Sequence, residues 1–307
     1  MTVESRIRSI AEELMIDAVG FAPLSEVPEE EMRRYSVWLQ EGKNGSMDYL
    51  ENYREVRRDP RLLLPDARSV IVIAVSYFPE IPQPSDAPQV AKYALGRDYH
   101  KVMKRLLMQL GERISDICPH SYRPLVDTAP LLERYWARRS GIGFIGRNSN
   151  LIIPGMGSFV FLGELLTTLP LSTDRECHSG CGACRRCVEA CPTSALHGSG
   201  IDARRCINYL TIEHRGDIEA TLARRLGNRL YGCDTCQDVC PYNRSPKTSR
   251  HFTASPRLLR LTDQSLVGFN SDTYAKLFYG SAATRAKEEG MTRNVNIYIT
   301  NKKATQQ

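Results

Sequence analysis

The sequence predicts a mixed α/β domain, followed by a small cysteine-rich domain and a short helical tail. Residues 70–75 form an unbroken apolar run, which predicts a buried strand. Nine of the ten cysteines lie between Cys177 and Cys240. Near Leu171 the composition changes from long apolar segments to short ones rich in Cys, Pro, Gly and Arg, as expected for a small domain held by bound metal. The predicted boundaries are 1–170, 171–250 and 251–307.

The elements of the first domain follow from periodicity. The N-terminus predicts a helix, since Ile7, Ile10, Ala11, Leu14 and Met15 recur at helical spacing. The run 70–75 is dominated by β-branched residues and predicts a strand buried on both faces. The Pro-rich segment 81–88 predicts a surface loop. Helices are then expected over 99–117 and 130–139.

Composition and charge exclude several classes of protein. With 307 residues, 42% hydrophobic and 25% charged, the chain is expected to form about two folded domains, neither disordered nor fibrous. Its formal charge of +6 permits an acidic partner without requiring one. The N-terminus lacks the apolar core of a signal peptide, so we expect a cytoplasmic protein whose clustered thiols bind metal. Prolines and glycines interrupt the apolar stretch 151–171, which predicts strand, turn and strand, and no membrane anchor.

The cysteine spacing predicts two [4Fe-4S] clusters. Residues 181–191 read C-x2-C-x2-C-x3-C and are followed by Pro192, the bacterial two-cluster ferredoxin pattern in which the fourth cysteine ligates the other cluster. The second group, within 233–240, lacks one cysteine, and Cys206 is its natural substitute. A ferredoxin-like domain is therefore expected. The exchange rule assigns Cys181, Cys184, Cys187 and Cys240 to one cluster, and Cys191, Cys206, Cys233 and Cys236 to the other.

We considered zinc as the metal bound by these cysteines, and a dinucleotide as the ligand of the glycine-rich segment before them. Structural zinc would also use eight thiolates, but three cysteines within seven residues are unusual for zinc sites. Cys118 and Cys177 remain, and we interpret each of them as a small buried hydrophobe or a loop thiol. The GIGFIG sequence at 141–146 matches G-x-G-x-x-G, but it follows a helix and precedes a strand, which excludes a dinucleotide site. It leaves open a glycine-rich loop beside another bulky ligand.

Several segments together resemble epoxyqueuosine reductase. They are MDYLENYREVRRDPRLLLPDARSVIVIAVSY, AKYALGRDYH, VDTAPLLERYWARRSGIGFIGRNSNLI, GSFVFLGEL, the eight-cysteine pattern and CDTCQDVCPYN, in order over about residues 1–250. The reductive dehalogenases are similar more distantly. The resemblance implies base-off cobalamin on the α/β domain beside the ferredoxin-like domain. It also implies two-electron, two-proton removal of the epoxide oxygen from epoxyqueuosine at the wobble position of a tRNA anticodon stem-loop, giving queuosine.

The resemblance further implies roles for individual residues. Asp127, which could otherwise begin a turn or helix, matches the family's proton donor. A carboxyl that is protonated near neutral pH needs an apolar or crowded site, for which Ile142, Phe144 and Trp136 are candidates. His100 is left outside the site, as a hydrogen-bonded structural residue. The cobalamin contacts that the matching segments suggest are Arg57, Tyr93, Gly143, Gly146, Asn148, Leu151, Gly157, Ser158, Asp234 and Gln237; each could equally be a turn, surface or packing residue.

Partners are suggested by charge and by the redox cofactors. The arginines at 204, 205, 215, 224, 225 and 229 could grip RNA or form a solvated helix face. The region after 251 is expected to be polar and helical, with a basic end, and resembles the start of the helical repeats of longer family members. We expect a monomer that receives electrons from an external flavodoxin- or ferredoxin-type donor. The alternatives are a ferredoxin-type carrier without its own substrate and a cobalamin-dependent enzyme resembling the reductive dehalogenases.

Overall fold

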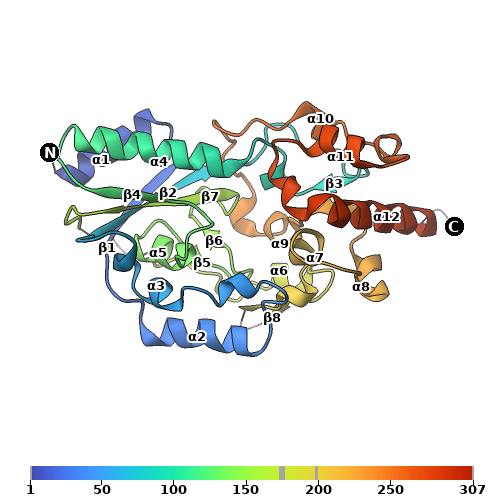
Figure 1. Cartoon of the computed structure of the whole chain (residues 1–307), viewed down its shortest axis with the longest axis horizontal. Helices are drawn as coiled ribbons and strands as arrows, with labels where there is room; N and C mark the ends of the chain where they lie inside the picture. Colours follow the sequence, from blue (N-terminus) through green and yellow to red (C-terminus); the bar gives the residue numbers. More distant parts are fainter. Residues whose placement is uncertain (1, 173–176, 198–199, 306–307) are drawn as a thin grey trace.

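A four-stranded antiparallel sheet organises the N-terminal half of the molecule (Figure 1). We describe it from a computed structural model, in which the described residues are 2–172, 177–197 and 200–305. The strands lie in the order β1-β2-β7-β4. Their bounds are Ala18–Pro23 for β1, Ser69–Ser76 for β2, Val160–Thr167 for β7 and Tyr122–Leu125 for β4.

The central strand β2 confirms the prediction from its apolar run. All eight of its residues are buried. Because side chains alternate across a strand, Ile71 and Ile73 pack in one core and Val70 and Val72 in another, one on each face of the sheet. The sheet therefore needs cover on both faces, although its strand pairings are all antiparallel.

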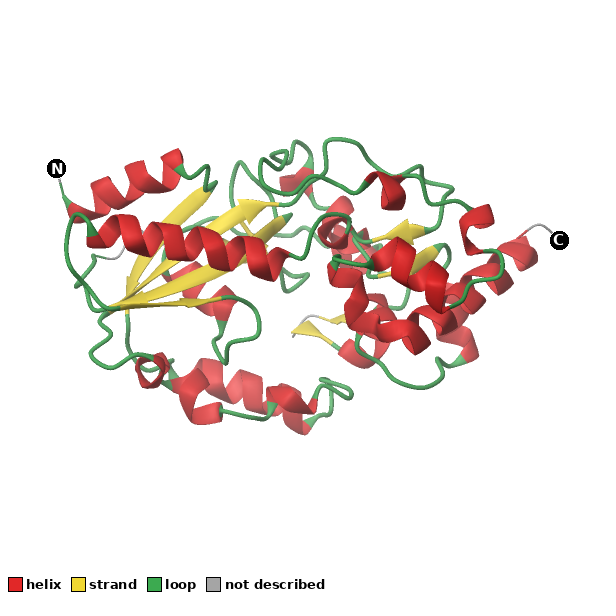
Figure 2. Ribbon diagram, turned by 45° about the horizontal axis from the view of Figure 1, so that its top comes forward, coloured by secondary structure: helices red, strands yellow, loops and turns green. Residues whose placement is uncertain are grey.

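Helices supply that cover. The helices α1 (Val3–Glu13) and α4 (Tyr99–Ser115) cover the face of Ile71 and Ile73, and α5 (Glu133–Arg139) covers the face of Val70 and Val72 (Figures 1 and 2). We call the core on the α1 and α4 side the upper core, and the core on the α5 side the core under the sheet. The predicted helices are confirmed, except that α5 begins three residues later than expected. The helices α2 (Glu29–Gln40) and α3 (Arg54–Arg58) follow β1 in the chain and lie beyond α5 in Figure 1.

The GIGFIG segment forms a small hairpin after α5. Its strands are β5 (Phe144–Ile145) and β6 (Leu151–Ile152), and no helix follows the glycines, as the exclusion of a dinucleotide site requires. A Cβ atom at Gly143 would come within 2.4 Å of the Ile152 carbonyl oxygen. The close approach of the hairpin's own strands thus explains this glycine. The prediction of strand, turn and strand over 151–171 holds, with β7 as the second strand.

The cysteine-rich half has short elements and a small core of its own. Ala203, Tyr209 and Leu210 form that core. The boundary near Leu171 is not a clean one, since β3 (Gln89–Val90) leaves the first domain and pairs in parallel with β10. The elements are α6 (Arg186–Glu189), β8 (Leu196–His197), β9 (Gly200–Ile201), α7 (Ile207–Ile212), α8 (Ala220–Arg225), β10 (Arg229–Tyr231) and α9 (Thr235–Asp238).

The C-terminal region is helical, as predicted, but the expectation of a polar tail is wrong. Phe278, Met291 and Val295 are fully or almost fully buried in a core shared with β3 and β10. Burial of these side chains fixes the region on the cysteine-rich half rather than leaving it as an appendage. Its last two residues lie outside the described part. The helices are α10 (Pro256–Leu259), α11 (Ser271–Phe278) and α12 (Lys287–Thr305).

Short 3₁₀ helices complete the described structure, at Asp48–Leu50, Pro60–Leu63, Lys92–Ala94, Ala203–Arg205, Pro241–Asn243, Asp263–Leu266 and Ala282–Ala286. Among the helices of the described residues, none has the length and apolar character that a bilayer crossing requires.

Candidate functional site

Asp127 lies at the end of β4, in the loop that leads to α5. Its backbone is in the left-handed region, with φ of +47°, and 53% of its side chain is exposed. Its Oδ2 atom accepts a hydrogen bond from the Tyr99 hydroxyl at 2.9 Å and lies 3.1 Å from His100 Nε2. The first turn of α4 therefore faces this loop with two polar side chains.

His100 belongs to this site, although the sequence interpretation left it out. Asp98 caps α4 by accepting the His100 backbone N–H at 3.1 Å, and its Oδ1 also lies 2.7 Å from His100 Nδ1. The imidazole thus lies between two carboxylates. Hydrogen bonding to Asp127 raises the pKa of His100, and Asp98 adds to the effect despite partial burial. The only sequence signal was the spacing of Asp98 and His100 at the start of a helix.

The expected apolar surroundings of Asp127 are wrong. Burial pushes its pKa upward, but the hydrogen bonds from His100 and Tyr99 outweigh burial, so the pKa of Asp127 is lowered overall. Trp136 and Ile142 belong to the core under the sheet, and Phe144 packs against Tyr242. The two shifts are in opposite directions, and both favour a protonated imidazole beside an ionised Asp127 carboxylate.

Two glutamates lie behind Asp127. Its backbone N–H donates to Glu133 Oε1 at 2.6 Å. Burial, followed by repulsion from Asp127, raises the pKa of Glu133 to about 7. Glu164 on β7 is 0% exposed, and burial next to Glu133 raises its pKa well above the ordinary value. Three carboxyl groups are therefore coupled electrostatically at this point.

The structure brings together the first predicted cysteine quartet. Cys181, Cys184, Cys187 and Cys240 line one pocket together with Arg147. The backbone N–H of Arg147 donates to Cys181 Sγ at 3.4 Å. Cysteines from two distant segments thus converge as the exchange rule expects.

The second quartet also gathers. Burial raises the pKa of Cys206 to about 11, and the neighbouring Cys233 and Cys191 add to the shift. Burial likewise raises the pKa of Cys236, beside Cys233 and Cys206. The Ala195 N–H donates to Cys191 Sγ at 3.3 Å. Hence Cys206 lies where the pattern lacked a cysteine.

The two remaining cysteines, Cys118 and Cys177, belong to neither quartet. Cys118 packs against the upper core of the sheet, which agrees with its interpretation as a small hydrophobe, and Cys177 is half-buried. Across the described ranges, no group of three or more His, Cys, Asp or Glu side chains is arranged to hold a single metal ion. A cubane distributes its thiolates over separate iron corners, so its ligands do not need that arrangement.

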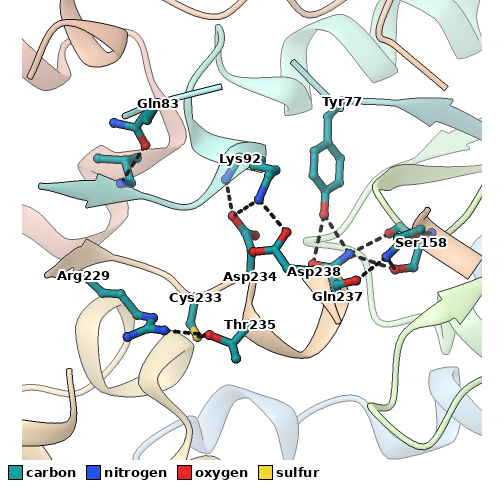
Figure 3. Close-up of polar contacts among 12 residues, drawn as sticks. Tyr77, Gln83, Lys92, Ser158, Arg229, Cys233, Asp234, Thr235, Gln237 and Asp238 are labelled. Carbon is teal, nitrogen blue, oxygen red and sulfur yellow. Dashed lines mark hydrogen bonds and ion pairs between the residues drawn. The ribbon is translucent and has the colours of Figure 1, made fainter. Parts of the chain in front are cut away.

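Most predicted cobalamin contacts lie at the junction between the two halves and are bound to other protein groups. Gln237 Nε2 donates to the Ser158 carbonyl at 2.8 Å and lies near the Tyr77 hydroxyl, while Asp234 accepts from the Lys92 backbone N–H at 2.8 Å (Figure 3). The others are Tyr93, which donates to the Tyr231 hydroxyl, Asn148, which donates to the Cys236 carbonyl, and Gly157, where a Cβ would meet Asn243 Oδ1 at 2.1 Å.

Among the predicted contacts that lie outside this group, Arg57 has a buried N–H donor, at Nε, without a partner among the described residues. Gly146 and Leu151 are buried in the hairpin, where a Cβ at Gly146 would meet the Ile152 side chain at 2.5 Å. An unpaired buried N–H is costly, so Arg57 fits a polar ligand group at this place.

The predicted RNA-binding arginines are mostly engaged within the protein. Arg205, Arg215 and Arg225 donate to backbone carbonyls, and Arg204 pairs with Asp202. The side chains of Arg204, Arg205, Arg224 and Arg225 remain exposed, so RNA binding by this group stays a prediction. Arg229 likewise donates to the Leu226 carbonyl.

A different polar and aromatic group stands beside Asp127. Arg285 pairs with Glu213 through Nε at 2.8 Å and lies over the Tyr49 ring at 5.7 Å. Tyr49 is 46% exposed. Both Arg285 and Tyr49 are close enough to Asp127 to interact with it electrostatically.

Comparisons with known proteins agree with this arrangement. The family model "4Fe-4S double cluster binding domain" matches residues 180–243, and "Epoxyqueuosine reductase QueG, DUF1730" matches residues 57–128. An epoxyqueuosine reductase of Cellulophaga algicola is 42% identical over 273 residues, covering 88% of this chain and 89% of the relative.

Solved structures share the fold. An epoxyqueuosine reductase from Streptococcus thermophilus superposes with a TM-score of 0.90 at 31% identity, over 98% of this chain and 82% of that chain. A second epoxyqueuosine reductase, crystallised with a tRNA-Tyr epoxyqueuosine-modified stem loop, gives a TM-score of 0.86 at 28% identity, over 98% and 82% of the two chains.

Proposed function

The chain belongs to the epoxyqueuosine reductase family, and from this premise we propose that it reduces epoxyqueuosine in a tRNA anticodon stem-loop to queuosine. The observation that carries the proposal is the 42% identity to a curated epoxyqueuosine reductase over nearly the whole chain. The polar site at Asp127 and the two cysteine quartets supply what such a reduction needs, namely a proton source and a path for electrons.

The cofactor sites follow from the residues present. Each cysteine quartet would hold one [4Fe-4S] cluster, and cobalamin would lie at the junction of the two halves, with Arg57 Nε donating to one of its polar groups. When bound, these groups supply the two electrons that convert the epoxide to an alkene, while two protons leave with the oxygen as water.

Proton supply is the task of this chain's own side chains. His100 Nε2 holds a proton next to Asp127 Oδ2, and Asp98 keeps the ring oriented through Nδ1. Tyr99 donates a second hydrogen bond to the same carboxylate oxygen. Asp127 would receive the imidazole proton and deliver it to the epoxide oxygen, because an alkoxide is a poor species to generate in a dry site.

We propose that stacking contributes to holding the RNA substrate. Tyr49 offers an exposed ring beside Asp127, supported from below by the Arg285 guanidinium. Unstacked bases of single-stranded loops are commonly gripped by such aromatic and guanidinium planes. We propose that a base of the anticodon loop stacks on Tyr49 when the modified nucleoside enters the site.

The decisive experiment is nucleoside analysis of tRNA from cells that lack this protein. We expect epoxyqueuosine to accumulate in these cells and queuosine to be absent, and complementation with the intact gene to reverse both. Unchanged queuosine in the deletion strain would contradict the proposal and favour a ferredoxin-type carrier without a substrate of its own. Complementation with an inactive variant provides the control.

The pocket of the first quartet is the entry point that we propose for an external electron donor. Arg147 and Arg186 line this pocket, and Arg186 and Arg244 line the adjoining depression; all three side chains are exposed. Flanking acids at Glu189 and Asp238 offset this charge only in part. Charge complementarity then favours an acidic donor of flavodoxin or ferredoxin type.

We predict that Arg186→Glu slows cluster reduction by an acidic flavodoxin by about tenfold at low salt, because the substitution reverses one steering charge. Stopped-flow absorbance measures the rate. The difference should shrink as salt screens the charges, and reduction by dithionite should not change. The matched control is Lys104→Glu on α4, which should behave as wild type. An equal effect of both substitutions would place the donor elsewhere.

A further inference from the structure

Glu164 is a buried carboxyl in an apolar setting. Its Cα pairs across the sheet with those of Val72 and Leu125, whose side chains belong to the core under the sheet together with Trp136. Directly paired residues on neighbouring strands share a face, so Glu164 lies in that core. It is 0% exposed, and neither of its oxygens has a hydrogen-bond donor among the residues that the structure describes.

The neighbour of this carboxyl determines its state. An ionised carboxylate without any donor is far too costly in an apolar core, so Glu164 is stable there only as the neutral acid. The neutral acid carries one O–H donor. The adjacent Glu133 carboxyl is the acceptor that faces it, and Glu133 Oε1 in turn accepts the Asp127 backbone N–H at 2.6 Å.

We propose that Glu164 and Glu133 share one proton, and that this shared proton fixes the backbone of Asp127 in the conformation that presents its carboxyl to the site. Both glutamates are then positioning residues, and the inference rests on the proposed role of Asp127. Loss of the proton would place two negative charges side by side behind a loop whose left-handed backbone, at φ of +47°, needs support.

The charged groups around the pair define the expected pH dependence. Asp127 from the β4–α5 loop and Arg134 on α5 act on Glu133, while Tyr99 and His100 on α4 and Arg285 act on Asp127. The pKa of Glu133 is raised to about 7 by burial and by Asp127, so the folded state binds a proton that the unfolded state releases above about pH 4.5. Stability contributed by the pair is therefore present at low pH and lost as the pH rises through about 7.

The test is the Glu164→Gln variant, because Gln keeps the shape, offers an N–H donor to Glu133 and is neutral at every pH. At pH 8, above the pKa of about 7 of Glu133, the pair keeps only the shared proton. Wild-type protein should show the infrared C=O stretch of a protonated buried carboxyl at this pH, and the variant should lack it. The midpoint of thermal unfolding should fall from pH 5 to 8 in wild type and fall less in the variant. The high-pH limb of kcat should flatten in the variant as well.

Identical infrared spectra, or equal pH slopes in the two proteins, would overturn the inference. The exposed Glu112→Gln on α4 is the matched control and should reproduce wild type. If Glu164→Gln does not fold, Glu133→Gln tests the same pair: the C=O band of protonated Glu164 should remain but shift in frequency, because its acceptor changes from a carboxylate to an amide. Neither the infrared nor the unfolding measurement needs turnover, so failure of the proposed activity would leave this inference testable by itself.

Discussion

Replacement of Asp127 by Asn should leave a folded protein with turnover lowered by about 10²- to 10⁴-fold, the usual contribution of a positioned proton donor. Asn has nearly the same shape and is one of the few residues that tolerate a left-handed backbone, which Asp127 adopts. Its amide can still accept the Tyr99 hydroxyl, but it cannot take up and deliver a proton. Single-turnover conversion of epoxyqueuosine tRNA, followed by nucleoside analysis, measures the effect.

Asp66→Asn is the matched control for this substitution. Asp66 is also an exposed aspartate with a positive φ, of +59°, and it makes no contact with the site described above. We expect this variant to turn over as wild type does. Full activity in Asp127→Asn would remove Asp127 from the catalytic role, whereas equal losses in both variants would indicate a general effect of the substitution on stability.

The elements that could be predicted are those indicated by residues close together in the sequence. The run 70–75 needs only its own residues to indicate a buried strand, and the spacing within 181–191 indicates a cluster ligand set before any fold is known. Cys206 was assignable because the ligand count required a fourth thiolate, and it lies beside Cys191 and Cys233.

The polar site could not be predicted because its members are distant in the chain. His100 is recognisable only when the loop at Asp127 is brought against the first turn of α4. Glu133 and Glu164 appear in the sequence as a helix residue and a strand residue, and their coupling depends on how α5 packs under β7. The arginines are an intermediate case: Arg205 and Arg225 are exposed, as their clustering suggested, but they also donate to carbonyls within the fold, which the sequence does not indicate.

Replacement of Cys206 by Ala should remove one of the two clusters and with it nearly all turnover. Iron content should fall from about eight to about four per chain, because one quartet loses a thiolate that no nearby cysteine can replace. The remaining cluster should still be visible by electron paramagnetic resonance after reduction. Without the second cluster, electrons that enter at the exposed pocket would have no path to the Asp127 site.

Cys118→Ala is the control for Cys206→Ala, since Cys118 packs in the upper core away from both quartets and should leave iron content unchanged. Metal binding and folding are coupled in domains with small cores, so Cys206→Ala could lose the whole domain. Cys206→Ser covers that case: a serine oxygen can still ligate iron, and we expect a retained cluster with an altered spectrum. Eight irons and an unaltered spectrum in both Cys206 variants would contradict the assignment. The fourth ligand of the second cluster would then be a residue other than Cys206.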